Sequence, residues 1–343
     1  MIMKKIFTIL GAALLSGALA VCFVSCEEED QTNRVLQGEV ITSDFVNPVY
    51  GADAPDPSVI KARNGKYYAY TTNAQIFESE DLVNWTNLSG AFEGTQYPNW
   101  LNGGAVWATD INYIDGKYVL YYALSKWGEG MKNGVGVATA LKPTGPFTDT
   151  GAMFTSEEIG VENSIDPCYY YHEGKHYLAW GSWHGIWLAE LTPNALRVNN
   201  SVPLKQLAGT AFEAPMIYER NGYFYLFCSI GACCEGLNST YETVVCRSES
   251  LFGPYVDKEG KSMLDNNYEV ILTTNESFVG PGHNSEIITD DEGKTWMLYH
   301  AYNVANPAAN RCIMLDEVKW DSEGWPYVDG PSSSVQSGPV FKN

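Results

Sequence analysis

Three acidic residues stand in nearly the same local setting at distant points of the sequence. They are Asp56 in APDP, Asp166 in SIDP and Glu213 in FEAP. Because proline fixes its own φ and restricts the residue before it, each acid is expected on an extended backbone that aims its side chain in one direction. A carboxyl group of fixed aim can act as a general acid or a general base. The pattern predicts a catalytic group of three carboxyls, provided that the fold brings them together.

The elements that must position these acids are predicted by a repeated hairpin pattern. In each copy a short apolar strand runs into a tight turn at glycine, and an aromatic strand with period-2 alternation follows. The clearest copy is 164–183, SIDPCYYYHEGKHYLAWGSW. Successive turn glycines are 48 to 71 residues apart, and they are Gly65, Gly116, Gly174, Gly222 and Gly293.

Strand-rich repeats of about 40 to 50 residues are typical of a β-propeller. Five units predict an all-β, five-bladed β-propeller, which we expect over residues 46–343 as a single catalytic domain. The first strand of each unit should be innermost, so radial repetition should bring the acids to one end of the central channel. Asp110 holds the comparable place in the second unit, and His283 and Glu286 hold it in the fifth.

Paired carboxyls at such a position suit hydrolysis of a glycosidic bond. One carboxyl must be protonated to assist the leaving oxygen and the other must be ionised, and a third can raise the pKa of the acid by like-charge repulsion. The alternative is that each acid only caps a turn or is hydrogen-bonded in the core. Three acids in register across repeats favour the catalytic interpretation.

The composition of the chain limits the classes of molecule that it is expected to bind. The formal net charge is −20 and 13% of the residues are aromatic. Without a run of Lys and Arg after the first few residues, the acidic chain is not expected to bind nucleic acid. The aromatic residues suit blade packing or stacking on sugars. We expect a monomer.

The first 26 residues read as a lipoprotein signal peptide. Lys4 and Lys5 precede an apolar run that ends at FVSC, which makes Cys26 the expected lipidated residue and Cys22 a weaker candidate. A transmembrane anchor is the competing interpretation. Residues 27–45 are polar and are expected to be a tether. These features predict an outer-membrane lipoprotein that contacts the membrane only through its lipid, on either the cell surface or the periplasmic side.

Ten segments, in order, carry a resemblance to glycoside hydrolase family 43, of the arabinan endo-1,5-α-L-arabinosidase type. They are ADAPDPSV, SEDLVNWT, VWATDI, SIDPCYY, GSWHGIWLAEL, AFEAPM, CCEGLNSTYETVVCRS, GPYVDKEG, GPGHNSE and DEVKWDSEGWPYV. The resemblance implies a five-bladed propeller that inverts configuration, with arabinan as substrate. It implies Asp56 as general base, Asp166 as pKa modulator and orienter, and Glu213 as general acid. It also implies that His283 helps to hold an ion near the propeller axis, commonly calcium.

Four further residues are candidates for substrate contact. Trp107 and Trp183 could stack on a furanose, since aromatic faces suit the apolar face of a sugar. Asn163 and Ser182 stand beside the acids and could hydrogen-bond sugar hydroxyls. For all four, the alternative role is packing within or between blades.

Rival functions remain within and beyond the family. An exo-α-L-arabinofuranosidase or a β-xylosidase would use the same acids, and the cleavage mode depends on loops such as 230–241, expected on the active-site face. WATD in place of the usual WAPD, and Glu235 where an arginine is usual, leave that mode open. Fructan hydrolases are disfavoured by Ile165 and Ala214. A non-catalytic glycan-binding surface lipoprotein is disfavoured by the retention of all three acids.

Overall fold

The computed structural model describes residues 40–342. The chain divides into two units, 1–37 and 38–343, and the second contains every described residue. Cys26, the signal peptide and tether residues 27–39 therefore lie outside the described residues. Across residues 40–342 no helix combines the length and the apolar character needed to cross a membrane.

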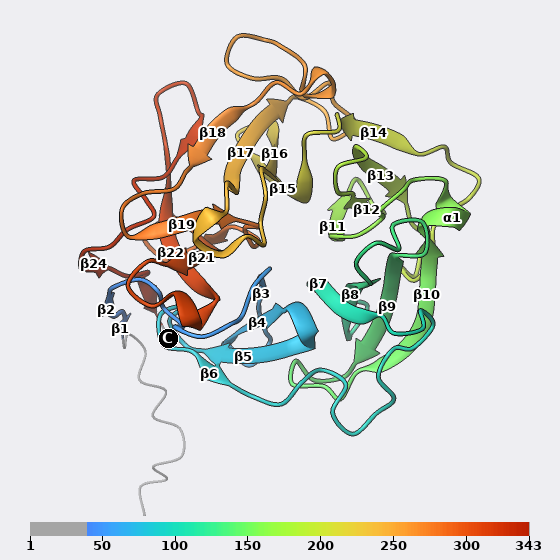
Figure 1. The fold of residues 1–343 in the computed structure, drawn as a ribbon, viewed down its shortest axis with the longest axis horizontal. Helices are drawn as coiled ribbons and strands as arrows, with labels where there is room; N and C mark the ends of the chain where they lie inside the picture. Colours follow the sequence, from blue (N-terminus) through green and yellow to red (C-terminus); the bar gives the residue numbers. More distant parts are fainter. Residues whose placement is uncertain (1–39, 343) are drawn as a thin grey trace, which may run out of the picture. The chain divides into compact units, whose positions relative to one another are not determined.

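The second unit is a ring of antiparallel sheets around a central axis (Figure 1), which confirms the five-bladed propeller. Blade 1 contains β3 (Ser58–Lys61), β4 (Tyr67–Thr71), β5 (Gln75–Ser79) and β6 (Thr86–Asn87). Blade 2 contains β7 (Ala105–Ile114), β8 (Lys117–Ser125), β9 (Gly134–Ala140) and β10 (Thr148–Thr155). Blade 3 contains β11 (Cys168–His172), β12 (Lys175–Trp180), β13 (Ile186–Glu190) and β14 (Lys205–Ala208).

The last two blades follow the same order with one change. Blade 4 contains β15 (Glu213–Arg220), β16 (Tyr223–Ile230), β17 (Glu242–Ser248) and β18 (Glu269–Leu272). Blade 5 contains β19 (Phe278–Gly282), β20 (Ile288–Thr289), β21 (Thr295–Asn303), β22 (Arg311–Trp320) and β23 (Pro326–Tyr327). Both β19 and β20 pair with β21, so the innermost strand of blade 5 is interrupted. His283 and Glu286 lie in that interruption.

The predicted hairpins are confirmed at all five turns. Each turn glycine has a left-handed backbone, with φ between 79° and 85°, which glycine adopts without a Cβ clash. The helical elements within residues 40–342 are short: helix α1 (Ser156–Ile159) and the 3₁₀ turns η2 (Thr72–Ala74), η3 (Gly236–Asn238), η4 (Met263–Asp265) and η5 (Pro307–Ala309).

Period-2 alternation gives each blade two buried faces. Along β8, Leu120 and Tyr122 pack in the cluster shared with blade 1, whereas Val119 and Tyr121 pack in the cluster shared with blade 3. The other three blade interfaces have equivalent apolar clusters. Most of the aromatic residues therefore form blade packing, and the ring holds the inner strands at fixed positions.

Two short strand pairs close the ring between the ends of the described chain. β1 (Val40–Ile41) pairs with β25 (Phe341–Lys342), and β2 (Asp44–Phe45) pairs with β24 (Gln336–Ser337). The predicted tether boundary at residue 45 is therefore wrong for 40–45. The reason is that the buried Phe45 packs against Trp296 of blade 5, with ring centroids 6.4 Å apart.

Candidate active site

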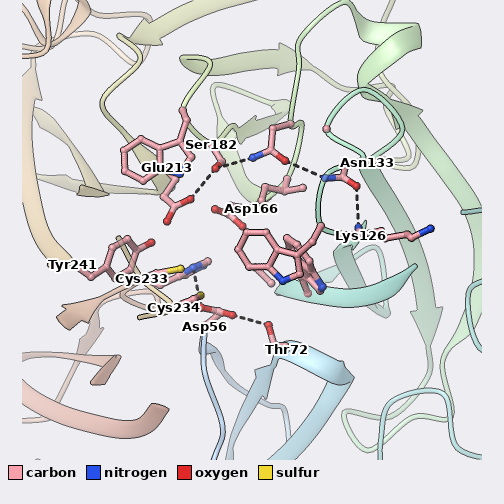
Figure 2. Close-up of a pocket in the computed structure, with 18 of the residues that line it drawn as sticks. Asp56, Thr72, Lys126, Asn133, Asp166, Ser182, Glu213, Cys233, Cys234 and Tyr241 are labelled. Atoms are coloured by element: carbon pink, nitrogen blue, oxygen red, sulfur yellow. Dashed lines mark hydrogen bonds and ion pairs between the residues drawn. The ribbon is translucent and has the colours of Figure 1, made fainter. Parts of the chain in front are cut away.

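A cavity of about 560 Å³ opens where the inner strands begin. All eight cavity residues expected from the sequence line it, namely Asp56, Trp107, Asn163, Asp166, Ser182, Trp183, Glu213 and His283. Figure 2 shows acids from blades 1, 3 and 4 turned toward one space. The fold thus brings together residues that are more than 150 positions apart in the sequence.

The backbone is left-handed at Asp56 and Asp166 and directly after Glu213, which corrects the expectation of an extended backbone at each acid. Asp56 has φ 61°, Asp166 has φ 58°, and Ala214, directly after Glu213, has φ 54°. In blades 1 and 3 the inner strand starts only after the proline, which has no N–H for the ladder, so the acid lies on a bend outside the sheet. Left-handed non-glycine residues cost about 1–3 kcal/mol each and cluster at functional sites. His283, with φ 49°, follows the same rule.

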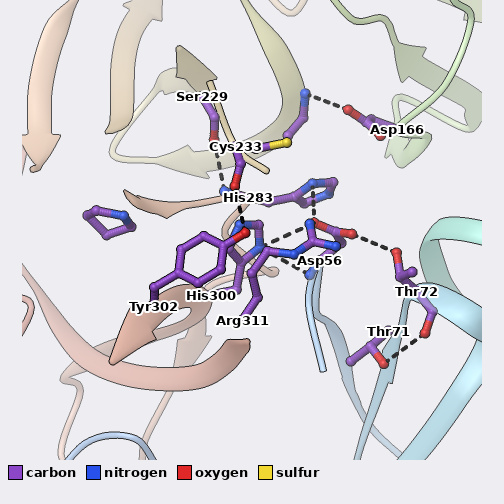
Figure 3. A network of polar contacts seen from close by, with 12 residues as sticks. Asp56, Thr71, Thr72, Asp166, Ser229, Cys233, His283, His300, Tyr302 and Arg311 are labelled. Atoms are coloured by element: carbon purple, nitrogen blue, oxygen red, sulfur yellow. Dashed lines mark hydrogen bonds and ion pairs between the residues drawn. The ribbon is translucent and has the colours of Figure 1, made fainter. Parts of the chain in front are cut away.

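Asp56 lies among basic groups (Figure 3). Its Oδ1 atom is 3.4 Å from Arg311 Nη1, 3.3 Å from His283 Nδ1 and 3.2 Å from His300 Nδ1. The Thr72 hydroxyl donates to Oδ2 at 2.6 Å. Burial by itself raises the pKa of Asp56, but Arg311 and His283 outweigh burial and hold this pKa well below its ordinary value. Asp56 is therefore an ionised carboxylate.

Glu213 lies among neutral groups. The Ser182 hydroxyl donates to its Oε2 atom at 2.7 Å, and Tyr241 is a second hydroxyl partner. Burial raises the pKa of Glu213 above its ordinary value, although both hydroxyls oppose the rise. Sequence reasoning assigned this rise to repulsion from Asp166, but in the structure burial is the largest cause.

Asp166 lies beside Glu213 and is linked to the same strand. Its Oδ2 atom accepts the backbone N–H of Ala214 at 3.1 Å. Burial, with repulsion from Glu213 and Asp56 opposed by His283, raises the pKa of Asp166 to about 8. Two carboxyls that resist ionisation thus stand opposite one that is ionised. That combination provides a proton donor and a base in one cavity, as hydrolysis requires.

His283 is fixed from both sides. Its backbone N–H donates to Ser229 Oγ at 2.8 Å, and its ring faces Asp56. Burial by itself lowers the pKa of His283, but Asp56 raises it to about 9. His300 is the opposite case, because burial lowers its pKa to about 4 and its Nδ1 accepts the Asp56 N–H at 3.2 Å.

The residues around His283 do not form a calcium cage. Within residues 40–342 there is no group of three or more His, Cys, Asp or Glu side chains arranged to hold a metal ion. Calcium takes six to eight oxygen ligands, whereas the His283 ring is paired with Asp56. An ion here would depend on water for most of its ligands, so no chemical step is assigned to it.

The expected substrate contacts fall into two kinds. Trp183 is 37% exposed at the cavity rim, and Trp107 packs against Trp127 with ring centroids 5.2 Å apart. Asn163 and Ser182 are instead bonded to each other, with Asn163 Nδ2 donating to Ser182 Oγ at 3.0 Å. The tryptophans are available to a sugar, whereas the two polar residues are part of the protein's own network.

Asp110 holds the comparable place in blade 2 but lies outside the cavity lining. It accepts the backbone N–H of Tyr169 at 3.0 Å and is hydrogen-bonded to Glu286. Glu286 in turn accepts the Ser58 hydroxyl at 2.7 Å. Burial raises the pKa of Asp110 well above its ordinary value. These contacts join blades 1, 2, 3 and 5 near the axis.

Several cavity residues had no clear sequence signal. Arg311, at the start of β22, brings its guanidinium to Asp56, and Trp127 stands alone in its segment. His300 lies behind the lining, fully buried, and also had no signal. Tyr241 belongs to the segment CCEGLNSTY, where a signal was present but its partner was not predictable. From the same loop, Cys233 and Cys234 also line the cavity, and both are free thiols.

A five-bladed propeller with one carboxyl of lowered pKa and two of raised pKa in one cavity defines a glycoside hydrolase of the acid/base type. The profile described as Glycosyl hydrolases family 43 matches residues 45–326, and the chain belongs to this family.

The chain is also similar to individual arabinan-degrading proteins. The chain is 34% identical over 288 residues to the extracellular endo-alpha-(1->5)-L-arabinanase 1 of Bacillus subtilis, covering 79% of this chain and 86% of that protein. It is 33% identical over 306 residues to an extracellular exo-alpha-(1->5)-L-arabinofuranosidase of Cellvibrio japonicus, covering 81% and 86%. The solved Cellvibrio cellulosa alpha-L-arabinanase complexed with arabinohexaose has a TM-score of 0.74 and 30% identity, covering 81% of this chain and 95% of that one.

Proposed function

We propose that this glycoside hydrolase cleaves α-1,5-linked L-arabinan inside the polymer and inverts the configuration of the attacked carbon. The observation that supports it most is that two acids in one cavity have opposite surroundings, with cationic groups lowering the pKa of Asp56 and burial raising that of Glu213. The substrate is inferred from the relatives, which include an endo-alpha-(1->5)-L-arabinanase and an exo-alpha-(1->5)-L-arabinofuranosidase.

Each acid has one task in this mechanism. Asp56 is the general base that takes a proton from the attacking water, since Arg311 and His283 keep it ionised. Glu213 is the general acid that protonates the leaving oxygen. Asp166 holds the strand of Glu213 through the Ala214 N–H. Inversion requires the water to fit between Asp56 and the sugar, on the face opposite to the leaving group.

Trp107 and Trp183 are proposed to stack on the sugar rings at the rim of the cavity. Trp127 is 75% exposed beside Trp107 and extends the same aromatic surface away from the acids. A surface that continues beyond the reacting sugar suits a long polymer more than a single terminal residue. This arrangement supports the endo mode of cleavage.

Digestion of linear arabinan, with early products sized by chromatography, tests the function. We expect a mixture of oligosaccharides in the first minutes. Release of arabinose alone would transfer the assignment to an exo-enzyme, activity on xylosides alone to a β-xylosidase, and binding without any hydrolysis to a glycan-binding lipoprotein.

Calcium remains a proposal for the axis near His283, where water would provide most ligands. Its contribution would be electrostatic, and the acid and base described above do not require it. Exhaustive chelation followed by melting and activity measurements tests it. An ion with a role should produce a loss that added calcium reverses, whereas unchanged values would remove calcium from the account.

We also propose that the protein is a monomeric outer-membrane lipoprotein anchored through Cys26. The basis is the sequence of residues 1–26 and the acidic run that follows. Metabolic labelling with a fatty acid should mark the wild type and fail to mark Cys26→Ala. Label that persists in the variant would point to Cys22 or to no lipid on Cys26.

A further inference from the structure

A chain of hydrogen bonds runs from a backbone N–H directly after β8 of blade 2 to the carboxyl of Glu213 (Figure 2). Its links are Lys126 N–H to Asn133 Oδ1 at 3.0 Å, Asn133 Nδ2 to Asn163 Oδ1 at 3.0 Å, Asn163 Nδ2 to Ser182 Oγ at 3.0 Å, and Ser182 Oγ to Glu213 Oε2 at 2.7 Å.

The first link fixes the direction of all the others. A backbone N–H can only donate, so Asn133 must turn its oxygen to Lys126 and its NH₂ group to Asn163. Asn163 must then present its own oxygen to Asn133 and its NH₂ group to Ser182. The Ser182 oxygen is thereby occupied as an acceptor, and its hydrogen is left to be donated to Glu213.

We propose that Asn133 and Asn163 are positioning residues that act through Ser182 and keep the acidic proton of Glu213 on Oε1. An oxygen that accepts a hydrogen bond at 2.7 Å is the worse place for the proton, so the Ser182 bond disfavours protonation of Oε2 and favours delivery of the proton from Oε1 to the leaving oxygen. The inference rests on the proposed function, because it assigns Glu213 the role of general acid.

We call Asn133, Asn163 and Ser182 the relay to Glu213. The backbones of its two asparagines are held rigidly. Asn133 is 2% exposed. Its backbone carbonyl oxygen accepts the backbone N–H of Ser156 at 2.7 Å and the Ser156 hydroxyl at 2.9 Å. Asn163 has φ 50°, a left-handed conformation that asparagine tolerates, and its N–H donates to Gly130 O at 3.0 Å. The fixed backbones hold both side-chain amides within hydrogen-bonding distance of their partners.

The relay also predicts a pH signature. The groups that affect the charge of Glu213 are Asp56, Asp166, Ser182, Tyr241 and His283. The Ser182 hydrogen bond favours the ionised carboxylate and so opposes the rise in the pKa of Glu213. Removing it should raise this pKa further and shift the basic limb of the kcat/KM profile to higher pH, a change that a general loss of packing would not produce.

The test compares two substrates in the full-length enzyme. Arabinohexaose has a leaving oxygen that needs a proton, whereas a dinitrophenyl glycoside of arabinotriose does not. Ser182→Ala should lower kcat on arabinohexaose about tenfold, the equivalent of one hydrogen bond, and change kcat on the activated glycoside by less than about threefold. Asn133→Ala and Asn163→Ala should lower kcat on arabinohexaose by a smaller factor, again with little change on the activated glycoside. Ser182→Thr keeps a hydroxyl and should keep the activity that Ser182→Ala loses.

A double variant separates a relay from independent contacts. If the residues act in series, Asn133→Ala combined with Ser182→Ala should lose no more than Ser182→Ala alone. Ser125→Ala is the matched control, because this buried hydroxyl on β8 has no hydrogen-bond partner in the described part of the chain. We expect it to retain full activity.

Three outcomes would overturn the relay: equal losses on both substrates, additive losses in the double variant, or full activity of Asn133→Ala. Melting temperatures measured alongside identify any variant that fails to fold, and Ser182→Thr then supplies the comparison. A wild type inactive on both substrates would overturn the proposed function itself, which is a distinguishable result.

Discussion

The base region and the acid region of the cavity differ in charge although their sequences are alike. Asp56 stands among Arg311, His283 and His300, from blade 5. Glu213 stands among the hydroxyls of Ser182 and Tyr241. Both acids are buried, so burial alone would leave both protonated.

The neighbours of the acids, and not the acids themselves, divide the two chemical roles. Blade 5 brings His283 to the cavity from the interruption between β19 and β20, and its strand β22 brings Arg311. The irregular blade therefore supplies the positive charge that makes one of several similar acids a base. A propeller of five identical blades would not provide this asymmetry.

The largest effects are expected from removing the two acids. Asp56→Ala should be inactive on both arabinan and an activated aryl glycoside, because both reactions need the water that Asp56 activates. Glu213→Ala should lose about 10²- to 10⁴-fold on arabinan and retain much more on the activated substrate. Steady-state kinetics on both substrates checks this. Equal losses in Glu213→Ala would contradict the division of roles.

Removing the Arg311 guanidinium should make the pKa of Asp56 more like that of Glu213. In Arg311→Met the pKa of Asp56 should rise, because an opposite charge lowers a carboxyl pKa by about 1–3 units. A base is active when deprotonated, so the acidic limb of the kcat/KM profile should move to higher pH. Arg220→Met, which removes an arginine stacked on Trp320, is the control. An unmoved limb would show that Arg311 does not control Asp56.

A smaller contrast is expected in stability. The raised pKa of Asp166, about 8, means that the folded protein loses stability as pH rises from about 4 to 8, so Asp166→Asn should melt higher than the wild type near pH 7. The lowered pKa of Asp56 contributes stability that is present above about pH 4 and lost in more acidic solution, so Asp56→Asn should melt lower. Each kcal/mol corresponds to about 2–4 °C.

Melting curves of both variants at pH 4, 6 and 8 check the signs. The gain in Asp166→Asn should grow from pH 4 to pH 8. Two variants that shift the melting temperature in the same direction at pH 8 would contradict the difference between the two regions.

The sequence predicted the blades and the acids because both follow local patterns. Turn glycines such as Gly174, with alternating aromatic residues beside them, specify a hairpin whatever surrounds it. Asp56, Asp166 and Glu213 shared a motif, so the repeat placed them in one cavity. These features depend on neighbours in the sequence.

The rest of the site depends on contacts between blades. Arg311 reaches Asp56 from 255 residues away, and Asn133 reaches Asn163 across a loop, with no motif around either. The prolines indicated restricted backbones but not the sign of φ, because the bends at Asp56 and Asp166 result from strand pairing that starts after the proline. Phe45 was assigned to the tether because its partner, Trp296, lies in blade 5.

The anomeric configuration of the first product tests the central claim most directly. If Asp56 activates water while Glu213 protonates the leaving oxygen, the sugar carbon is attacked once and its configuration inverts. Proton NMR during the first turnovers of an α-linked arabino-oligosaccharide should show the β-anomer before mutarotation. An initial α-anomer would contradict the account and make Asp56 a nucleophile.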